Sequence, residues 1–210
     1  MKYKVMIVED QTMPRELFEL RVQSSERFEV ALSIDNAALT DVYCLRFPVD
    51  LILMDVVTRG GESGLDAAER IKRAFPQIKI IIVTSMPECS YLSRAREIGV
   101  ESFWYKEEQR ESLLDVMERT MAGESVYPDA TPEMQLGLTS SYELTDRELE
   151  VLREMTGGDT NQEIAERLHM SVATVKTHIL NMLEKTGFRN RTELAVRARE
   201  SGLVILNRKK

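Results

Sequence analysis

Short apolar runs alternate with amphipathic stretches five times over the first 122 residues. The runs have the length and composition of buried strands, and the one at 28–32 alternates apolar and polar residues as an edge strand does. Five such units in succession favour a parallel, doubly wound sheet of the flavodoxin-like kind, with helices on both faces. The predicted strands are residues 3–8, 28–32, 49–54, 78–83 and 100–105.

Between the strands, apolar residues recur at the three- and four-residue spacing of helices that cover a sheet. We expect Leu17, Phe18 and Leu20 of the first helix to face inward. The helices are predicted to begin near Pro14, Ala37, Ser63 and Pro87, and the fifth is predicted to end at Ala122.

Four of the predicted strands end in polar residues, which a parallel sheet brings to one edge. Neighbouring carboxylates repel one another unless a cation joins them, and their oxygens suit Mg²⁺. A carboxylate beside such a metal can act as a nucleophile towards a phosphoryl group, whose oxygens an ammonium and a hydroxyl could hold. Taken singly, each residue is more often a cap, a turn residue or a solvated charge. The residues concerned are Glu9, Asp10, Asp55, Thr84 and Lys106.

Residues 144–210 contain four short helical patterns and no strand pattern. Two begin with capping boxes at Thr145 and Thr160, and a third begins at Ser171 after a tight turn. A short helix, a turn and a longer helix over about 161–180 match a helix-turn-helix, whose second helix lies in the major groove. A solvated helix face fits the spacing equally well. The predicted outward face holds Ala173, Thr174, Lys176, Thr177, Leu180 and Asn181.

The intervening residues 123–143 contain prolines, glycine and a serine pair but few periodic apolar positions. They are predicted to form a linker, with a helical turn near residues 132–136. The sequence therefore divides into a first domain at 1–122, a linker at 123–143 and a second domain at 144–210.

Charge is distributed unevenly along a chain whose net charge is −7. Residues 144–210 carry a net charge of +2 and the remainder −9, which suits cation binding by the first domain. Cys44 and Cys89 lack a metal-ligand or redox spacing and are expected to be reduced, mostly buried thiols. No stretch is apolar enough to span a membrane and the chain begins with a strand pattern, so we expect a cytoplasmic protein without a membrane partner.

The first domain resembles the receiver domains of response regulators. The matching residues are Glu9-Asp10, Asp55 in Leu-Met-Asp-Val, Thr84, and Lys106 preceded by Phe103. The resemblance implies phosphorylation of Asp55 by a histidine kinase, and a switch in which Thr84 and Phe103 reorient together. It also implies Mg²⁺ held by Glu9, Asp10, Asp55 and the backbone carbonyl of Val57.

One loop departs from the pattern of that family. Thr58-Arg59 stands where Met-Pro is usual, and Gly64 lies one residue later than the usual glycine. The loop after Asp55 therefore carries one extra residue relative to the pattern of that family.

Residues 144–203 resemble the LuxR-type DNA-binding domain. The resemblance implies DNA contacts by Thr174, Lys176 and Thr177, with Asn161 and Arg191 touching the DNA backbone. It also implies dimerisation through the last helix. The matching segments begin at Leu144, Asn161, Ser171 and Arg191, and the implied dimerisation residues are Thr192, Leu194, Ala195 and Ala198.

The two resemblances follow the order of NarL/FixJ-type response regulators. We therefore expect a transcription regulator that is phosphorylated on Asp55 and binds inverted-repeat promoter sites as a homodimer. It is not expected to be a turnover enzyme. Two alternatives stay open: a constitutive DNA-binding regulator whose atypical receiver serves for dimerisation, and a stand-alone aspartyl-phosphate phosphatase.

Overall fold

The computed structural model describes residues 2–59, 62–88, 90–106 and 111–204 and contains two compact units. Most residues up to Ala130 belong to the first unit and most residues from Thr131 onward to the second. Among the described residues, no helix is long and apolar enough to cross a membrane.

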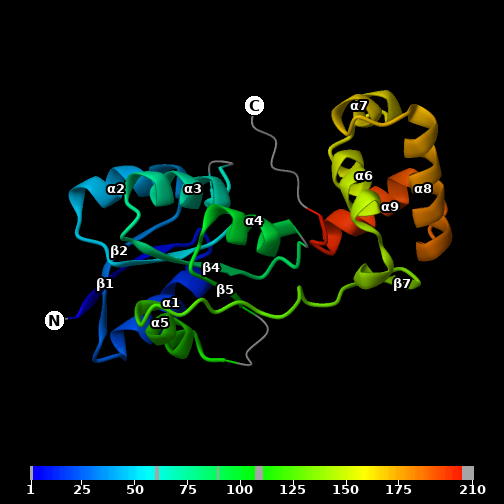
Figure 1. Ribbon diagram of the computed structural model, residues 1–210. Helices are drawn as coiled ribbons and strands as arrows, with labels where there is room; N and C mark the ends of the chain where they lie inside the picture. The colour runs from blue at the N-terminus through cyan, green and yellow to red at the C-terminus, as the bar shows by residue number, and fades with distance from the viewer. Residues whose placement is uncertain (1, 60–61, 89, 107–110, 205–210) are drawn as a thin grey trace. The chain divides into compact units, whose positions relative to one another are not determined.

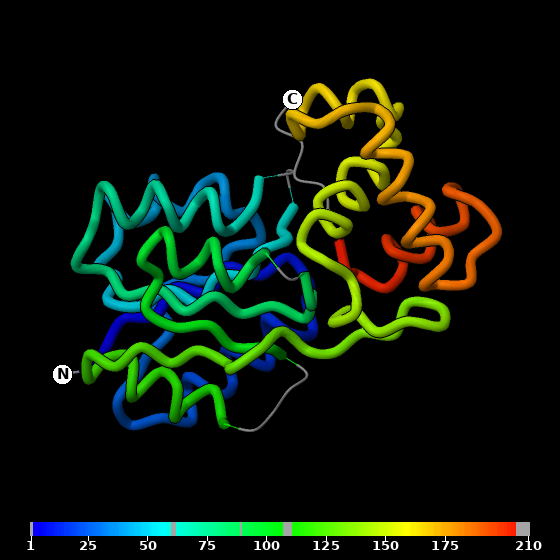
Figure 2. Tube along the Cα trace, turned by 45° about the vertical axis from the view of Figure 1, so that its right-hand side comes forward, coloured from blue at the N-terminus to red at the C-terminus, as the bar shows by residue number. Residues whose placement is uncertain are grey.

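The first unit is a five-stranded parallel sheet in the order β2-β1-β3-β4-β5. Helices α2, α3 and α4 cover one face, while α1 and α5 cover the other, as both views of the trace show (Figures 1 and 2). The order and the two helical layers confirm the predicted doubly wound, flavodoxin-like class. The strands are β1 (Tyr3–Val8), β2 (Phe28–Ile34), β3 (Leu51–Met54), β4 (Lys79–Thr84) and β5 (Ser102–Tyr105). The helices are α1 (Thr12–Gln23), η1 (Ala37–Leu39), α2 (Thr40–Arg46), α3 (Gly64–Ala74), α4 (Ser90–Ile98) and α5 (Leu113–Met121).

Helix α1 buries Phe18 as predicted, but not Leu17 or Leu20. Leu17 and Leu20 are 47% and 64% exposed, whereas Phe18 and Val22 are buried. Phe18 and Val22 are four residues apart and so lie on the same side of the helix. The Phe18 ring meets Trp104 of β5 edge-on, with centroids 6.5 Å apart. This aromatic contact lies between the helix and the sheet, so it accounts for the face that α1 presents.

Two other helices begin later than the sequence predicts. Residues 37–39 form a 3₁₀ turn capped by the Asn36 side chain, and the α-helix begins only at Thr40. Helix α4 begins at Ser90, three residues after Pro87. Cys44 is half-buried, and Cys89 lies outside the described residues.

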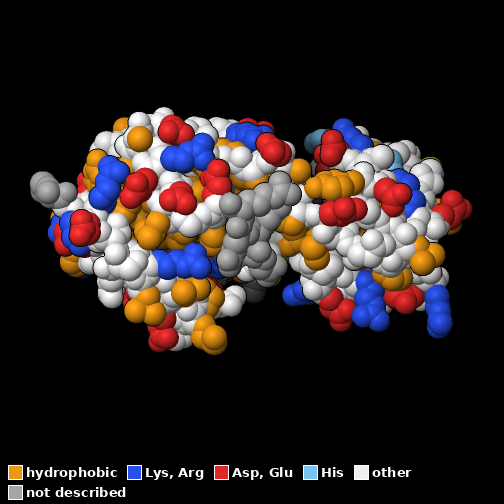
Figure 3. Space-filling model, turned by 90° about the horizontal axis from the view of Figure 1, so that it is seen from below, with side chains coloured by type: hydrophobic (Ala, Val, Ile, Leu, Met, Phe, Trp, Pro, Cys, Tyr) orange, Lys and Arg blue, Asp and Glu red, His pale blue; other side chains and the backbone are white. Residues whose placement is uncertain are grey.

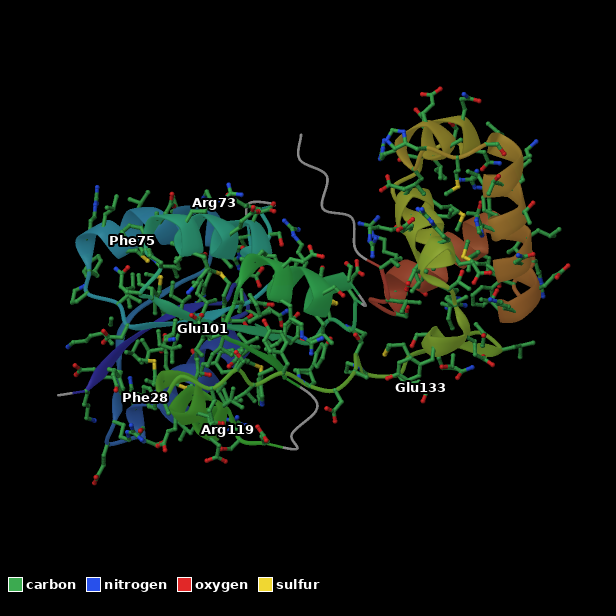
Figure 4. All side chains as sticks on the ribbon, in the orientation of Figure 1. Phe28, Arg73, Phe75, Glu101, Arg119 and Glu133 are labelled. Atoms are coloured by element: carbon green, nitrogen blue, oxygen red, sulfur yellow. The ribbon has the colours of Figure 1, made fainter. Side chains whose placement is uncertain are left out.

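A half-buried ion pair connects elements at the amino-terminal edge of the sheet. Glu101, labelled in Figure 4, accepts hydrogen bonds from Lys72 Nζ at 2.7 Å and from the Ile80 backbone amide at 2.9 Å. Its carboxylate thus joins α3, β4 and the approach to β5. These contacts hold the amino-terminal edge of the sheet, whereas the polar strand ends lie at the opposite, carboxyl edge.

Residues 123–143 are more structured than a plain linker. Val126 lies parallel to β5 and forms a bridge with Ser102, and the Tyr127 hydroxyl donates to the Val100 carbonyl at 2.8 Å. A short antiparallel hairpin, β6 (Gln135–Leu136) and β7 (Thr139–Ser140), replaces the predicted helical turn. Gly137 in its turn has a φ of +65°, a backbone conformation that favours glycine.

The second unit is all-helical apart from this hairpin. Its helices are η2 (Ser141–Glu143), α6 (Asp146–Thr156), α7 (Asn161–Arg167), α8 (Val172–Thr186) and α9 (Arg191–Glu200). The predicted capping boxes at Thr145 and Thr160 are both formed, and Ser171 caps α8. The core includes Val151, Leu152, Ile164, Val175, Met182 and Leu194.

A buried carboxylate anchors α6 to α8. Glu148 is 2% exposed, and its Oε2 accepts from Lys185 Nζ at 2.7 Å and from the Thr145 amide at 2.8 Å. Burial alone would raise the pKa of Glu148, but the hydrogen bonds from Lys185 and Thr145 hold that pKa below its ordinary value. Because the folded pKa is lowered, this carboxylate stabilises the fold at neutral pH and loses that contribution as the pH falls through the folded pKa.

We therefore expect Glu148→Ala to lower the free energy of unfolding of the second unit by about 2–3 kcal/mol, since it leaves the Thr145 amide and Lys185 without their acceptor. Calorimetry of the whole chain measures this change. Trp104, the single tryptophan, lies in the first unit, so its fluorescence should be unaltered. The matched control is Glu150→Ala, which removes a partly exposed partner of Arg147 and should cost under about 0.5 kcal/mol. Equal losses in the two variants would contradict the anchoring role.

Candidate functional sites

The register of the sheet brings the predicted carboxylates together. Val8 of β1 pairs with Met54 of β3, and the Asp55 amide donates to the Val8 carbonyl at 2.9 Å. Glu9 and Asp55 are buried, and Asp10 is half-buried. Carboxylate oxygens of Glu9, Asp10 and Asp55 lie within 4.8 Å of one another, close enough for one cation to contact all three. Hard oxygen donors in this number suit Mg²⁺ or a similar divalent ion.

Lys106 reaches the same point from the end of β5. Its backbone amide donates to the Thr84 carbonyl at 2.9 Å, so the β4–β5 pairing fixes its position. Its Nζ donates to Glu9 Oε2 at 2.6 Å and to Asp55 Oδ2 at 2.7 Å. Thr84 is fully buried at the end of β4. All five polar strand-end residues predicted from the sequence therefore lie at one edge of the sheet.

Burial and charge act in opposite directions on this cluster. Burial raises the pKa of Asp55 to about 6, Glu9 adds to the rise, and the ammonium of Lys106 opposes it. Burial would lower the pKa of Lys106, but Asp55 and Glu9 together raise it above its ordinary value. Asp55 is thus a carboxylate whose charged form is costly and whose neighbourhood favours a cation.

The loop after Asp55 is held at both ends despite its extra residue. The Gly64 amide donates to the Val56 carbonyl at 2.8 Å, and Val57 bridges Ser63. A Cβ on Gly64 would lie 1.9 Å from the carbonyl oxygen of Asp55, so only glycine fits there. The Thr58 hydroxyl accepts from the Ala37 amide at 3.0 Å, which fastens the loop to η1. Residues 60–61 of this loop lie outside the described residues.

Thr84 and Phe103, the predicted switch pair, are both buried. Phe103 also contacts a residue whose role the sequence does not reveal, because the Tyr127 ring lies 6.3 Å from it. The Phe103 amide donates to the Val126 carbonyl at 2.8 Å. An aromatic residue in a linker with few periodic apolar positions is the sequence signal for this contact, although its partner could not be named from the sequence.

In the second unit, α7, a turn and α8 form the predicted helix-turn-helix. His169 in the turn has a φ of +52°, a conformation uncommon outside glycine that histidine adopts more often than most residues. Thr174, Lys176 and Thr177 are all exposed on α8. In the view of Figure 3, basic and acidic side chains are interspersed over the second unit, and no large basic patch is seen on that face.

Asn161 and Arg191 are brought together from two helices. One guanidinium nitrogen of Arg191 donates to Asn161 Oδ1 at 2.9 Å and another to the Asp159 carbonyl at 2.8 Å. The starts of α7 and α9 are therefore linked. Asp159 is a member of this cluster that no motif in the sequence singles out.

The predicted dimerisation helix is only partly available for contacts. Leu194 and Ala198 are fully buried in the core of the second unit, so their side chains cannot reach a partner directly. Thr192 is exposed and Ala195 half-buried, and Val196, which the sequence interpretation did not include, is 49% exposed. The apolar spacing of Leu194 and Ala198 reflects packing within the unit.

The pKa of Asp55 gives a stability test. Because that pKa is raised from 3.8 to about 6, the protonated carboxyl is favoured by folding, and its contribution is lost as the pH rises from about 4 through 6. In metal-free buffer near pH 7.5, Asp55→Asn should raise the free energy of unfolding by up to about 3 kcal/mol, and by less near pH 5. Denaturant unfolding followed by Trp104 fluorescence measures this. If the cluster holds Mg²⁺, adding the metal should stabilise the wild type more than the variant, because a divalent cation would bind the charged carboxylate. If Asp55→Asn were less stable than the wild type in metal-free buffer, the result would contradict a raised pKa of Asp55 in the folded protein.

Comparisons with known proteins agree with both halves of this geometry. The family model "Response regulator receiver domain" matches residues 5–118, and "Bacterial regulatory proteins, luxR family" matches residues 142–198. The response regulator protein VraR of Staphylococcus epidermidis is 33% identical over 97% of this chain and all of its own length. VraR of Staphylococcus aureus is 32% identical over the same shares.

Solved structures share the fold over almost the whole chain. RcsB in an RcsB–DNA complex has a TM-score of 0.64 at 20% identity, covering 95% of this chain and 98% of that one. The response regulator ChrA of a heme-sensing two-component system has a TM-score of 0.52 at 22% identity, covering 95% of this chain and 97% of its own. The chain belongs to the response regulators that combine a receiver domain with a LuxR-type DNA-binding domain, and it is a DNA-binding transcription regulator.

Proposed function

We propose that phosphorylation of Asp55 by a histidine kinase controls DNA binding by this regulator. The observation that supports this most strongly is the contact of Lys106 Nζ with both Glu9 and Asp55 at the carboxyl edge of the sheet. It places a cation beside the carboxylate that would react. The receiver match over residues 5–118 supports the kinase as the phosphodonor class.

In this proposal an oxygen of Asp55 attacks the phosphorus of the donor, the donor's bond to phosphorus breaks, and an acyl phosphate forms. Mg²⁺, held by Glu9, Asp10, Asp55 and the Val57 carbonyl, would neutralise the charge of the phosphoryl group. Lys106 and the Thr84 hydroxyl would bind phosphoryl oxygens. Such a protein modifies itself and is not a turnover enzyme.

The second unit would act as a homodimer on inverted-repeat sites. Four of the structural relatives are described as RcsB bound to DNA, one of them as two dimers on two DNAs, which supports a dimeric complex for this chain. Half-sites about one helical turn apart would place α8 of each copy in successive major grooves. The exposed part of α9, with Thr192 and Val196, is the proposed surface for contact between the copies.

The alternative of a receiver that serves only for dimerisation gains no support from the loop that suggested it. The extra residue is accommodated by the Val57–Ser63 bridge and the Thr58 hydrogen bond, and the carboxylates remain clustered. A phosphatase active on external substrates would not require the second unit.

We expect Asp55→Ala to abolish the increase in DNA affinity that acetyl phosphate and Mg²⁺ produce in the wild type. Titrations of labelled promoter DNA with and without the phosphodonor measure the increase. The control is Asp50→Ala at the opposite end of β3, where the carboxylate accepts from the Lys4 amide. Asp50→Ala should retain the increase in DNA affinity that acetyl phosphate and Mg²⁺ produce. Full enhancement in Asp55→Ala would exclude this residue as the acceptor.

A second variant tests the proposed DNA surface. Lys176→Ala should weaken DNA binding by about 3- to 30-fold and, if the ammonium meets a phosphate, reduce the dependence of log affinity on log salt by about 1. Phosphorylation of Asp55 should be unaffected. Arg73→Ala, which removes an exposed cation on α3 (Figure 4), is the control and should leave DNA affinity as it was. Unchanged binding by Lys176→Ala would place the DNA on another surface.

A further inference from the structure

The outward face of α8 carries a row of apolar groups. Ala173, Thr177 and Leu180 are spaced by four and three residues, so at about 100° per residue they point within about 60° of one another. All three are exposed, and Leu180 is 56% exposed. The opposite side of the same helix supplies Val175, Ile179 and Met182 to the core. Leu180 is therefore not part of the packing that holds the unit together.

Thr177 contributes its methyl group, rather than its hydroxyl, to the outer surface of this row. The Thr177 hydroxyl donates to the Ala173 carbonyl at 3.1 Å, which turns the oxygen against its own helix. A threonine held in this way has its side-chain rotamer fixed, with the methyl group directed away from that carbonyl. One turn further along, the Leu180 side chain extends the same apolar surface.

Polar residues flank the row on both sides. Thr174 bonds its hydroxyl to that of Ser171 at 2.8 Å, and Lys176 and Asn181 are exposed at the edges of the face. A single exposed leucine on a helix is ordinary and by itself indicates nothing. Here it lies near the centre of the face of α8 opposite the buried residues, which the proposed function directs at the duplex, so its chemistry bears on which base the helix contacts.

We propose that Leu180, together with the methyl group of Thr177, contacts the 5-methyl group of a thymine in each half-site. Thymine is the base that offers a methyl group in the major groove, and apolar side chains recognise it by contact. A leucine cannot hydrogen bond to the amino or carbonyl groups of the other bases, whose desolvation would be uncompensated. This inference rests on the proposed placement of α8 in the major groove and names the base chemistry that it reads.

The test uses full-length protein treated with acetyl phosphate and Mg²⁺, and DNA sites selected by this protein from random sequence. Each thymine of the selected half-site is replaced in turn by deoxyuridine, which lacks only the methyl group. The wild type should lose about 3- to 10-fold in affinity at one thymine of each half-site, the loss expected for removing one buried methyl contact. In Leu180→Ala the same replacement should cost clearly less, because only the Thr177 methyl contact remains to be lost.

Three controls sharpen the comparison. Leu180→Met keeps an apolar side chain of similar volume and should retain the loss on deoxyuridine substitution. Leu138→Ala removes another exposed leucine of the same unit, 81% exposed in the β6–β7 turn, and should behave as the wild type. With cytosine at the sensitive position, 5-methylation of that cytosine should strengthen binding by the wild type more than by Leu180→Ala.

The possible results separate this inference from the proposed function. A selected site that tolerates deoxyuridine at every thymine, or a loss that persists undiminished in Leu180→Ala, overturns thymine reading by Leu180 and leaves phosphorylation-controlled DNA binding intact. A chain that selects no DNA sequence overturns both.

Discussion

The ammonium of Lys106 joins two buried carboxylates, and the carboxyl edge of the sheet depends on that contact. Glu9 and Asp55 are brought together by the β1–β3 pairing and would repel each other without a cation. Desolvation already raises the pKa of Asp55 to about 6. A divalent ion fits this cluster because it supplies positive charge to the carboxylates. A phosphoryl group fits it because its oxygens accept hydrogen bonds from donors such as the Lys106 ammonium.

The same edge is joined to the rest of the first unit by close packing. The Asp55 carbonyl lies so near Gly64 that no side chain fits between β3 and the start of α3. Lys106 is paired through its backbone to Thr84, and three residues before it Phe103 packs against Tyr127 of the segment that leads out of the unit. Strand β5 therefore connects the polar cluster at Lys106 with the beginning of the linker at Tyr127.

Much of this arrangement could be predicted from the sequence because apolar periodicity and strand ends are local signals. The five strands, the two domains' fold classes and the capping boxes at Thr145 and Thr160 follow from such signals. The exposure of Leu17 and Leu20 did not, since they are as apolar as Phe18 and only packing against the sheet, seen in the Phe18–Trp104 contact, selects which side chain is buried. Nor did the burial of Leu194 and Ala198, because an apolar spacing does not say whether the partner lies in the same chain.

The central claim is that Asp55 is the residue that receives the phosphoryl group. Borohydride reduction converts an acyl phosphate of aspartate to homoserine, which mass spectrometry locates in the chain. After incubation with acetyl phosphate and Mg²⁺, the account predicts homoserine at position 55, and none when Mg²⁺ is removed by a chelator. Homoserine at another aspartate with position 55 unchanged, or no homoserine at all, would contradict the account.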